Sequence, residues 1–349
     1  MDFYKEIERI RKVRELTQSE LEWMLELGEE HSEYLYRAAR EVCDEVYGRK
    51  VFIRGLIEYT NYCKNNCYYC GIRAGHVGLS RYRMSDDRIL ESVEKGYQLG
   101  ARTFVLQGGD SPMDGDAAIV KLVSRIHEAH PDCAITLGIG EKSRASYEAF
   151  FKAGADRYLL RHETANREHY HRLHPPAMKQ EHRVRCLFDL RDIGYQVGCG
   201  MMIGSPGQTV ECLYEDLMFI RELQPHMIGI GPFIPQRDTP FAGEREGSAD
   251  RTIKLLAILR LLHPRVLLPA TTALATVDGN GYEKGIKAGA NVLMPNLTPP
   301  DVRKKYMIYD GKKGIPVDDD EDFEETKQRL QDMGYEIAVE RGDSLVETA

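Results

Sequence analysis

Residues 85–107 read SDDRILESVEKGYQLGARTFVLQ and predict a helix, a glycine stop and a buried strand in direct succession. Apolar side chains recur at helical spacing between Ser85 and Leu99, and Gly100 can close that helix in a left-handed conformation. Arg102–Gln107 is then a short, mostly apolar run, typical of a strand inside a parallel sheet. The unit predicts an α/β fold built by repetition.

Strand-like runs of this kind occur eight times, separated by amphipathic helical stretches. The predicted strands are Val51–Glu58, Arg102–Gln107, Ala134–Ile139, Arg157–His162, Gln196–Ile203, Met227–Ile234, Leu267–Ala273 and Asn291–Pro295. The predicted helices include Ser85–Leu99, Ala117–His130, Ser143–Ala153, Glu181–Ile193, Thr209–Leu223, Ser248–Leu262 and Gly281–Ala288. Eight strand–helix units over about 250 residues predict a (β/α)8 barrel of the TIM type.

The pattern differs on either side of the barrel. Residues 1–48 are helical in pattern and predict an N-terminal helical layer, followed by the barrel at 49–300. Residues 301–349 predict a C-terminal extension that packs on the barrel and carries one more helix, Glu325–Met333. We interpret the acidic run Asp318–Asp322 as a solvated surface segment.

Charge and composition exclude several classes of partner. The net charge is −8 and the sequence has no dense run of Lys and Arg, which argues against nucleic acid. Met1–Glu8 is charged and has no apolar core, so we expect no secretory signal, and no uncharged stretch of about 18 apolar residues predicts a membrane span. Eight cysteines in 349 residues are too few for a disulfide scaffold. These features predict a cytoplasmic protein.

Three of those cysteines crowd into the loop after the first predicted strand. Residues 62–70 read YCKNNCYYC, so Cys63, Cys67 and Cys70 have the spacing C-x3-C-x2-C. Four thiolates would saturate a [4Fe–4S] cluster, whereas three leave one iron open for catalysis. A zinc site with His76 as fourth ligand, or three thiols that meet by chance, remain alternatives.

Polar residues also follow the other predicted strands. They occur at Gln107–Asp110, Thr136–Glu141, Arg161–Thr164, Gly204–Thr209, Thr271–Thr272 and Met294–Asn296. Active sites of such barrels lie at the carboxyl ends of the strands, so this distribution predicts a site there. Four histidines, at 169, 171, 174 and 182, lie in a helix-like connector, where a solvated face is the simpler interpretation. Cys133, Cys186, Cys199 and Cys212 are spread over helices and strands and predict small buried residues.

The cysteine loop after the first barrel strand resembles that of the radical S-adenosylmethionine (SAM) superfamily. The resemblance implies that the open iron is chelated by the amino and carboxylate groups of SAM. Electron transfer into the sulfonium would then release methionine and a 5′-deoxyadenosyl radical. The resemblance also implies that Tyr69, just before the last cysteine, packs near the adenine.

Over residues 50–310 the chain is similar to the HydE-type maturases of [FeFe]-hydrogenase, relatives of biotin synthase and methylornithine synthase. The stretches that carry this resemblance are 81–84, 105–107, 155–166, 204–209, 228–235, 269–273 and 289–296. The resemblance thereby implies a radical SAM enzyme that acts in maturation of the diiron subcluster of the hydrogenase. Its substrate would be small or organometallic, a cysteine-derived iron carbonyl–cyanide precursor.

The resemblance assigns SAM contacts to particular residues. Gly109 and Asp110 stand where the superfamily has a Gly-Gly-Glu segment, with Asp one methylene shorter than Glu. Glu163 becomes a ligand of the ribose or amine and Arg183 the partner of the SAM carboxylate. A plain turn at Gly109–Asp110 and an ordinary Glu–Arg pair are the alternatives. The further SAM contacts implied are Gln107, Thr136, Met202, Met294 and Tyr306.

Three arginines on strands predict a second kind of site. Arg54, Arg157 and Arg161 would point into the barrel, where charge is costly unless an anion compensates it. The resemblance implies anion or substrate contacts for these arginines, together with Thr271 and Thr272. The alternative is that Asp110, Glu163 or Glu58 merely neutralises the arginines.

Two other functions stay open. One is a methylornithine synthase-like mutase that rearranges lysine, and the other is a non-catalytic Fe–S electron carrier or scaffold. Some relatives hold a second Fe–S cluster bound by cysteines beyond the last strand, but this sequence has no cysteine after Cys212, so we expect no second cluster. A maturase would also need a low-potential electron donor and maturation partners.

Overall fold

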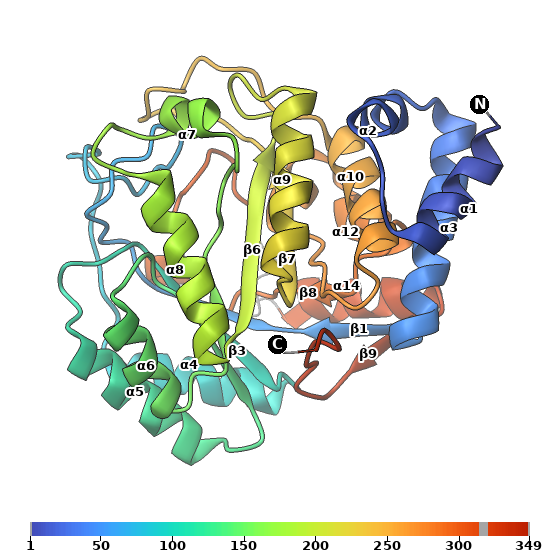
Figure 1. The fold of residues 1–349 in the computed structure, drawn as a ribbon. Coiled ribbons are helices and arrows are strands. Elements are labelled where there is room, and N and C mark those ends of the chain that lie inside the picture. Colours follow the sequence, from blue (N-terminus) through green and yellow to red (C-terminus); the bar gives the residue numbers. More distant parts are fainter. Residues whose placement is uncertain (1, 314–319, 348–349) are drawn as a thin grey trace.

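The computed structural model describes residues 2–313 and 320–347 (Figure 1). Its centre is a ring of parallel strands. Six of them form one sheet in chain order: β2 (Gly55–Thr60), β3 (Thr103–Gly108), β4 (Ala134–Gly138), β5 (Arg157–Leu159), β6 (Gln196–Ile203) and β7 (Met227–Pro232). Single parallel bridges, Met227 to Leu267 and Pro269 to Val292, carry the pairing on to β8 (Val292–Leu293). Pairing of β8 with β1 (Lys50–Ile53), and a bridge from Leu56 to Asn296, close the predicted barrel.

The first and seventh predicted strands differ from expectation. The backbone amides of Phe52, Arg54 and Leu56 all donate to the segment around β8, so the predicted strand Val51–Glu58 is one continuous extended segment. It divides into β1 and β2 because its other neighbour changes from β9 (Glu336–Ala338) to β3. The predicted strand Leu267–Ala273 is reduced to the two bridges, and α11 (Thr272–Val277) begins within it.

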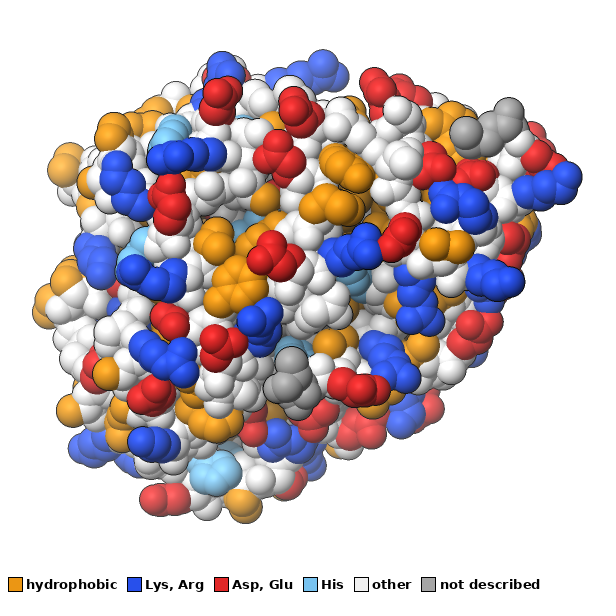
Figure 2. Space-filling model, viewed as in Figure 1, with side chains coloured by type: hydrophobic (Ala, Val, Ile, Leu, Met, Phe, Trp, Pro, Cys, Tyr) orange, Lys and Arg blue, Asp and Glu red, His pale blue; other side chains and the backbone are white. Residues whose placement is uncertain are grey.

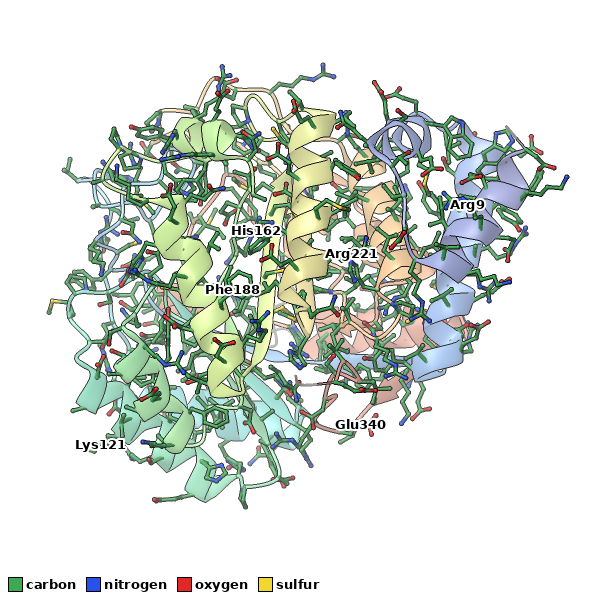
Figure 3. The ribbon with its side chains drawn as sticks, viewed as in Figure 1. Arg9, Lys121, His162, Phe188, Arg221 and Glu340 are labelled. Atoms are coloured by element: carbon green, nitrogen blue, oxygen red, sulfur yellow. The ribbon has the colours of Figure 1, made fainter. Side chains whose placement is uncertain are left out.

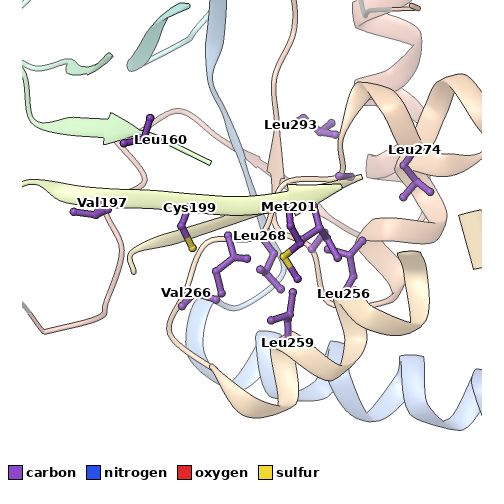
Figure 4. Packing of buried hydrophobic residues seen from close by; sticks show 14 of the residues in the cluster. Leu160, Val197, Cys199, Met201, Leu256, Leu259, Val266, Leu268, Leu274 and Leu293 are labelled. Carbon is purple, nitrogen blue, oxygen red and sulfur yellow. The ribbon is translucent and has the colours of Figure 1, made fainter. Parts of the chain in front are cut away.

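Helices cover the outside of the ring. They are α4 (Asp86–Gln98), α5 (Asp116–Ala129), α6 (Arg144–Lys152), α8 (Gln180–Ile193), α9 (Val210–Leu223), α10 (Ala249–Leu262) and α12 (Gly281–Lys287). Two further short helices, α7 (Arg167–Leu173) and α13 (Pro300–Arg303), follow strand ends. The first lies in the connector that the sequence predicts to be helix-like, whereas α13 was not expected. Figure 4 shows the layer between strands and helices, where Cys199 and Met201 of β6 lie beside Leu256 and Leu259 of α10. Cys133, Cys186, Cys199 and Cys212 are all buried, as predicted.

The N-terminal helices pack on one side of the barrel. They are α1 (Phe3–Val13), α2 (Gln18–Leu25) and α3 (Glu29–Tyr47), and Figure 1 shows them beside α10. Lys254 of α10, almost fully buried, donates to the carbonyls of Leu25 and Leu27, and Arg40 of α3 donates to the carbonyls of Ile286 and Ala290. These contacts fix the layer against the outer helices and leave the strand ends to other segments.

The C-terminal extension covers the amino-terminal end of the barrel. After α14 (Asp320–Asp332), strand β9 pairs with β1 at the bottom of Figure 1. Beyond it, Asp343 accepts from Arg157 of β5 at 2.7 Å, and Arg341 binds Asp156 at 2.7 Å. The interpretation of Asp318–Asp322 as solvated concerns side chains that lie outside the described residues.

Charge on the face that Figure 2 shows is mixed in sign. Acidic and basic side chains alternate over that face without a continuous basic stripe. Within the described residues, no helix has both the length and the apolarity needed to cross a membrane.

The Arg157–Asp343 contact should carry measurable stability. The Arg157 side chain is 3% exposed, so Asp343→Asn leaves a buried cation without its carboxylate. We expect the free energy of unfolding to fall by about 2 kcal/mol. The loss is smaller than for a fully buried pair because Asp343 itself is half exposed. Urea denaturation at neutral pH measures the loss. Glu340→Gln is the matched control. Glu340, labelled in Figure 3, lies in the same C-terminal segment as Asp343 and forms only an exposed ion pair, with Lys50 of β1. Equal loss in both variants would contradict the prediction.

Candidate active site

The cysteine loop follows β2 and is held by one side chain. Arg81 donates to the carbonyls of Asn61 at 2.5 Å, Ile72 at 2.7 Å and Arg73 at 2.6 Å, and to that of His76 at 3.4 Å. These carbonyls flank Cys63, Cys67 and Cys70 on both sides. A single planar guanidinium therefore fixes both ends of the segment that carries the thiols.

The end of β3 packs directly against the start of this loop. A Cβ atom on Gly109 would lie 2.3 Å from the Tyr62 carbonyl oxygen and 2.5 Å from the Cys63 Cβ, so only glycine allows the approach. Asp110 is buried and pairs with Lys64 at 3.2 Å and Lys142 at 2.7 Å. Its side chain therefore ties the cysteine loop to the end of β4, and it is not among the residues that line the neighbouring cavity.

The three thiols lie close enough to influence one another. Burial raises the pKa of Cys63 and Cys70, and raises that of Cys67 to about 12, although Arg183 acts in the opposite direction on Cys67. Among the described residues, no three His, Cys, Asp or Glu side chains converge as they would on a single metal ion. Thiolates of a cubane bind different irons and need no such convergence. His76 contacts the Gly71 carbonyl at 2.7 Å and Asp238 at 3.6 Å, which disfavours the zinc alternative.

Tyr69 projects from the cysteine loop into a small apolar group. Its hydroxyl lies 3.2 Å from Nε2 of His174, and Tyr69 packs with Met202 and Phe233. His174 and His169 are both buried, so the prediction of a solvated histidine face is wrong for these two residues. Burial lowers the pKa of His174 to about 3, which keeps the ring neutral beside Tyr69.

A cavity of about 300 Å³ opens at the carboxyl ends of the strands. The predicted site residues that line it are Gln107, Arg161, Glu163, Arg183, Thr271, Thr272 and Met294. Tyr306 is buried just behind this wall and accepts a long hydrogen bond of 3.5 Å from Gln107. The structure therefore brings together predicted residues from four strand ends, from α8 and from the loop beyond β8.

Three predicted residues lie elsewhere. All three, Arg54, Thr136 and Arg157, line a separate space of about 10 Å³ deeper in the barrel, room for about one water molecule. Nε and Nη2 of Arg54 and Oγ1 of Thr136 are buried there without a hydrogen-bond partner in the described residues, so an anion contact of Arg54 stays a prediction. Arg157 is bound by Asp343, Thr103 and the Arg341 carbonyl at the closed end of the barrel. Its contacts are structural, because no donor faces the cavity.

Glu163 sits at the cavity in a strained conformation. Its φ is +66°, a left-handed value that costs a residue with a Cβ about 1–2 kcal/mol. Its buried Oε2 lies 3.2 Å from Nη2 of Arg161, within ion-pair distance, but the two atoms form no hydrogen bond. Of the acids considered as neutralisers, only Glu163 meets one of the three arginines. A buried carboxylate oxygen with spare acceptor capacity is suited to a ligand that donates.

Two residues behind Glu163 hold the turn. Nε2 of His162 lies 3.3 Å from Asp216 of α9, and Asp216 also accepts from the backbone amide of Ala165 at 2.5 Å. His162 Nδ1 accepts from the Gly200 amide at 3.3 Å. Figure 3 shows His162 beside β6. The buried pair of His162 and Asp216 was not predicted. Its only signal in the sequence was the position of His162 within the polar end of a predicted strand.

Arg183 is anchored on α8 by Glu141, which follows β4. Its Nε donates to Glu141 and its Nη1 to the Arg161 carbonyl at 2.7 Å, while His182 also contacts Glu141, at 2.6 Å. Arg183, together with His182, lowers the pKa of the Glu141 carboxyl against its burial. No described acceptor meets Nη2, so one donor edge of this buried guanidinium is left for a ligand.

The family follows from comparison with known proteins. Residues 57–220 match the radical SAM superfamily, and the chain is 43% identical over 300 residues to the [FeFe] hydrogenase maturase subunit HydE of Thermotoga maritima. That alignment covers 86% of this chain and 85% of the relative. This chain belongs to the radical SAM superfamily.

Two further relatives agree with the barrel. The 3-methylornithine synthase of Methanosarcina acetivorans is 28% identical, over 95% of this chain and 93% of the relative. A crystal structure of methylornithine synthase matches with a TM-score of 0.83 at 27% identity, and covers 95% of this chain and 97% of that one. The predicted fold class and the resemblance to the superfamily are thus confirmed.

Membership implies a [4Fe–4S] cluster and SAM as cofactors, and the site of this radical SAM enzyme has the groups to hold them. Three thiols lie in a loop fixed by Arg81, and Glu163 and Arg183 offer an acceptor and a donor at the adjoining cavity. Lys312, Tyr309 and Glu141 also belong to this region but were not among the predicted site residues. Lys312 and Tyr309 come from the C-terminal extension, whose return to the cavity has no periodic signal.

We expect Arg81→Met to weaken retention of the cluster. Loss of the four carbonyl contacts frees the cysteine loop, and disruption of such supporting contacts typically costs about tenfold in metal retention. The measurement is the rate at which a ferrous chelator removes iron from the anaerobically reconstituted protein. Arg88→Met, which removes only an exposed pair with Asp301, should leave that rate unchanged. Equal rates in both variants would contradict a role for Arg81.

The strain at Glu163 predicts an unusual order of stabilities. Both Glu163→Gly and Glu163→Ala lose the carboxylate, but only glycine adopts a φ of +66° without cost. We expect the Gly variant to be more stable than the Ala variant by about 1 kcal/mol, measured by urea denaturation of the protein without cofactors. A more stable Ala variant would show that the turn relaxes.

Proposed function

We propose that this radical SAM enzyme holds one [4Fe–4S] cluster through Cys63, Cys67 and Cys70 and binds SAM in the adjoining cavity. When bound and reduced, the cluster supplies an electron to the SAM sulfonium, which yields methionine and a 5′-deoxyadenosyl radical. The three-cysteine count, and the lack of any cysteine after Cys212, support a single cluster with an open iron.

The charged groups nearest the cysteines suit the methionine end of SAM. Arg183 presents a donor edge to its carboxylate, and Glu163 presents a buried acceptor to its ammonium or to the ribose. Gly109 brings the backbone of β3 against the loop, and Tyr69 with Met202 offers an apolar surface for the adenine. Gln107, Met294 and Tyr306 complete the proposed SAM contacts. Thr136 and Asp110 do not line the cavity, so their influence on bound SAM would be indirect.

The proposed biological role is maturation of the [FeFe]-hydrogenase diiron subcluster, with a cysteine-derived iron carbonyl–cyanide precursor as substrate. The single observation that carries it is the 43% identity, over 85% of its length, to the Thermotoga maritima maturase. A low-potential electron donor and other maturation proteins are the implied partners, and the cytoplasm is the implied compartment. Arg161, Thr271 and Thr272 remain proposed substrate contacts because they line the cavity.

A second candidate is rearrangement of lysine, as the names of two relatives suggest. The match to the methylornithine synthase structure at TM-score 0.83 over 97% of that chain favours it. The lower sequence identity of 28%, against 43% for the maturase, places it second. Membership in an enzyme superfamily sets aside the electron carrier or scaffold.

The deciding assay is anaerobic. The protein is reconstituted with iron and sulfide, dithionite and SAM are added, and 5′-deoxyadenosine is quantified with and without lysine. We expect deoxyadenosine that does not depend on lysine, because the maturase role requires a different substrate. Conversion of the iron precursor would then be measured in the same preparation.

Cys67→Ala is the control, since it removes one proposed cluster ligand. Deoxyadenosine no higher than in that variant would overturn the assignment of the cluster. A yield that rises with lysine would move the function to the methylornithine reaction. Deoxyadenosine with no conversion of the iron precursor or of lysine would overturn both substrates and leave the cluster assignment standing.

A further inference from the structure

Glu58 and Lys312 form an ion pair on the cavity wall that the roles above do not use. Glu58, on β2, is fully buried, and the Lys312 side chain, from the C-terminal extension, is 8% exposed. The pair is separate from the Arg161–Glu163 and Arg183–Glu141 pairs. Burial of two charges carries a large desolvation cost, and a pair of well-packed apolar residues would close the wall at less cost. Its position beside the cavity therefore calls for a ligand.

Both partners keep hydrogen-bonding capacity. One carboxylate oxygen of Glu58 meets Lys312 and the other accepts from Asn296 at 3.1 Å, whereas a carboxylate has about four acceptor positions. The Lys312 ammonium has three donors, lies 5.2 Å above the Tyr306 ring and has Glu58 as its one recorded acceptor among the described residues. The Glu58 backbone is fixed by Thr298 and by the Tyr82 hydroxyl, so the carboxylate is pre-positioned.

Much of the rest of the cavity wall is uncharged. Met227, Pro269, Ala270, Ala273 and Met294 line it, together with the hydroxyls of Thr271 and Thr272. A ligand that fits this wall has a charged end at Glu58–Lys312 and a less polar remainder that contacts these uncharged residues. Since the two charges of the pair cancel, that charged end should carry both signs.

We propose that Glu58 and Lys312 form the substrate head-group site and bind the α-amino acid part of the substrate. Glu58 accepts hydrogen bonds from the α-ammonium group, and Lys312 donates to the α-carboxylate. The assignment rests on the proposed function, because it leaves the Glu163–Arg183 end of the cavity to SAM. It names the substrate class as a zwitterionic α-amino acid or a derivative that keeps both charged groups.

The pair also explains why singly charged analogues should be excluded. A zwitterion inserted between the partners replaces one Lys–Glu contact by two contacts of the same kind. A ligand with only one charge satisfies one partner and leaves the other buried without compensation. Discrimination of at least about tenfold follows from the loss of one charge-assisted hydrogen bond.

The test uses three thioether probes that cannot act as thiolate ligands. S-methyl-L-cysteine has both charges, 2-(methylthio)ethylamine lacks the carboxylate, and 3-(methylthio)propanoate lacks the ammonium. Each is titrated by calorimetry into the anaerobic, unreduced holoenzyme saturated with SAM, so that the SAM site is filled and no turnover occurs. We expect the zwitterion to bind at least about tenfold more tightly than either analogue.

Two substitutions separate the partners. Lys312→Met should weaken S-methyl-L-cysteine about tenfold and leave the amine probe unchanged, whereas Glu58→Gln should weaken the zwitterion and leave the acid probe unchanged. Lys312→Arg, which keeps the charge, should restore part of the affinity. Lys313→Met is the matched control, because the neighbouring Lys313 is exposed. Iron content and thermal midpoint verify that each variant is folded and loaded.

Several results would overturn the proposal. They are no saturable binding of the zwitterion to the wild type, equal affinity for all three probes, or equal weakening of all three by Lys312→Met. Affinity that depends on Glu163 or Arg183 instead would move the amino-acid site to the other end of the cavity. Failure of the proposed function is read separately, as SAM that yields no deoxyadenosine when dithionite is added to the same preparation.

Discussion

A charged side chain inside a closed barrel costs several kcal/mol unless an opposite charge or hydrogen bonds meet it, and this barrel contains such charges at both ends. At the carboxyl ends of the strands they occur as Arg161–Glu163, Arg183–Glu141 and Lys312–Glu58. At the amino-terminal end Arg157 meets Asp343. The partners come from distant segments, so compensation of charge links loops, helices and the C-terminal extension to the strands.

The two ends use that constraint differently. Each guanidinium nitrogen of Arg157 has an acceptor in the described residues, and the Thr103 hydroxyl and the Arg341 carbonyl are among them. At the other end, Oε2 of Glu163 lacks a hydrogen bond and the pairs border an open cavity. Arg157 and its partners close one end as structure, although Nε and Nη2 of the neighbouring Arg54 have no hydrogen-bond partner in the described residues. The partly satisfied charges at the other end border a cavity that can take a ligand.

Local pattern in the sequence was sufficient to predict the barrel and the cysteine loop. Helix-ending glycines such as Gly100 and Gly194, both with positive φ, were predicted because a helix end is a property of adjacent residues. The partners of charged residues were not predictable in this way. Asp343 lies 186 residues from Arg157, and Lys312 lies 254 residues from Glu58, and neither C-terminal residue belongs to a periodic element that would indicate its position. His174 was misjudged for a similar reason, because its burial depends on Tyr69 from another loop.

The strained backbone at Glu163 lies at the cavity end of the barrel, where the charges are only partly satisfied. Glu163 adopts its left-handed conformation between His162 and Ala165. The carboxylate of Asp216 on α9 contacts Nε2 of His162 and accepts a hydrogen bond from the backbone amide of Ala165. A strained turn persists only where neighbouring structure determines it, and here one buried carboxylate on a packed helix does so from both sides. Relaxed to an extended conformation, the chain at Glu163 would direct its side chain differently, and Arg161 would lose the carboxylate beside it. The cost of the turn is therefore the cost of keeping an acceptor and a donor together at the cavity.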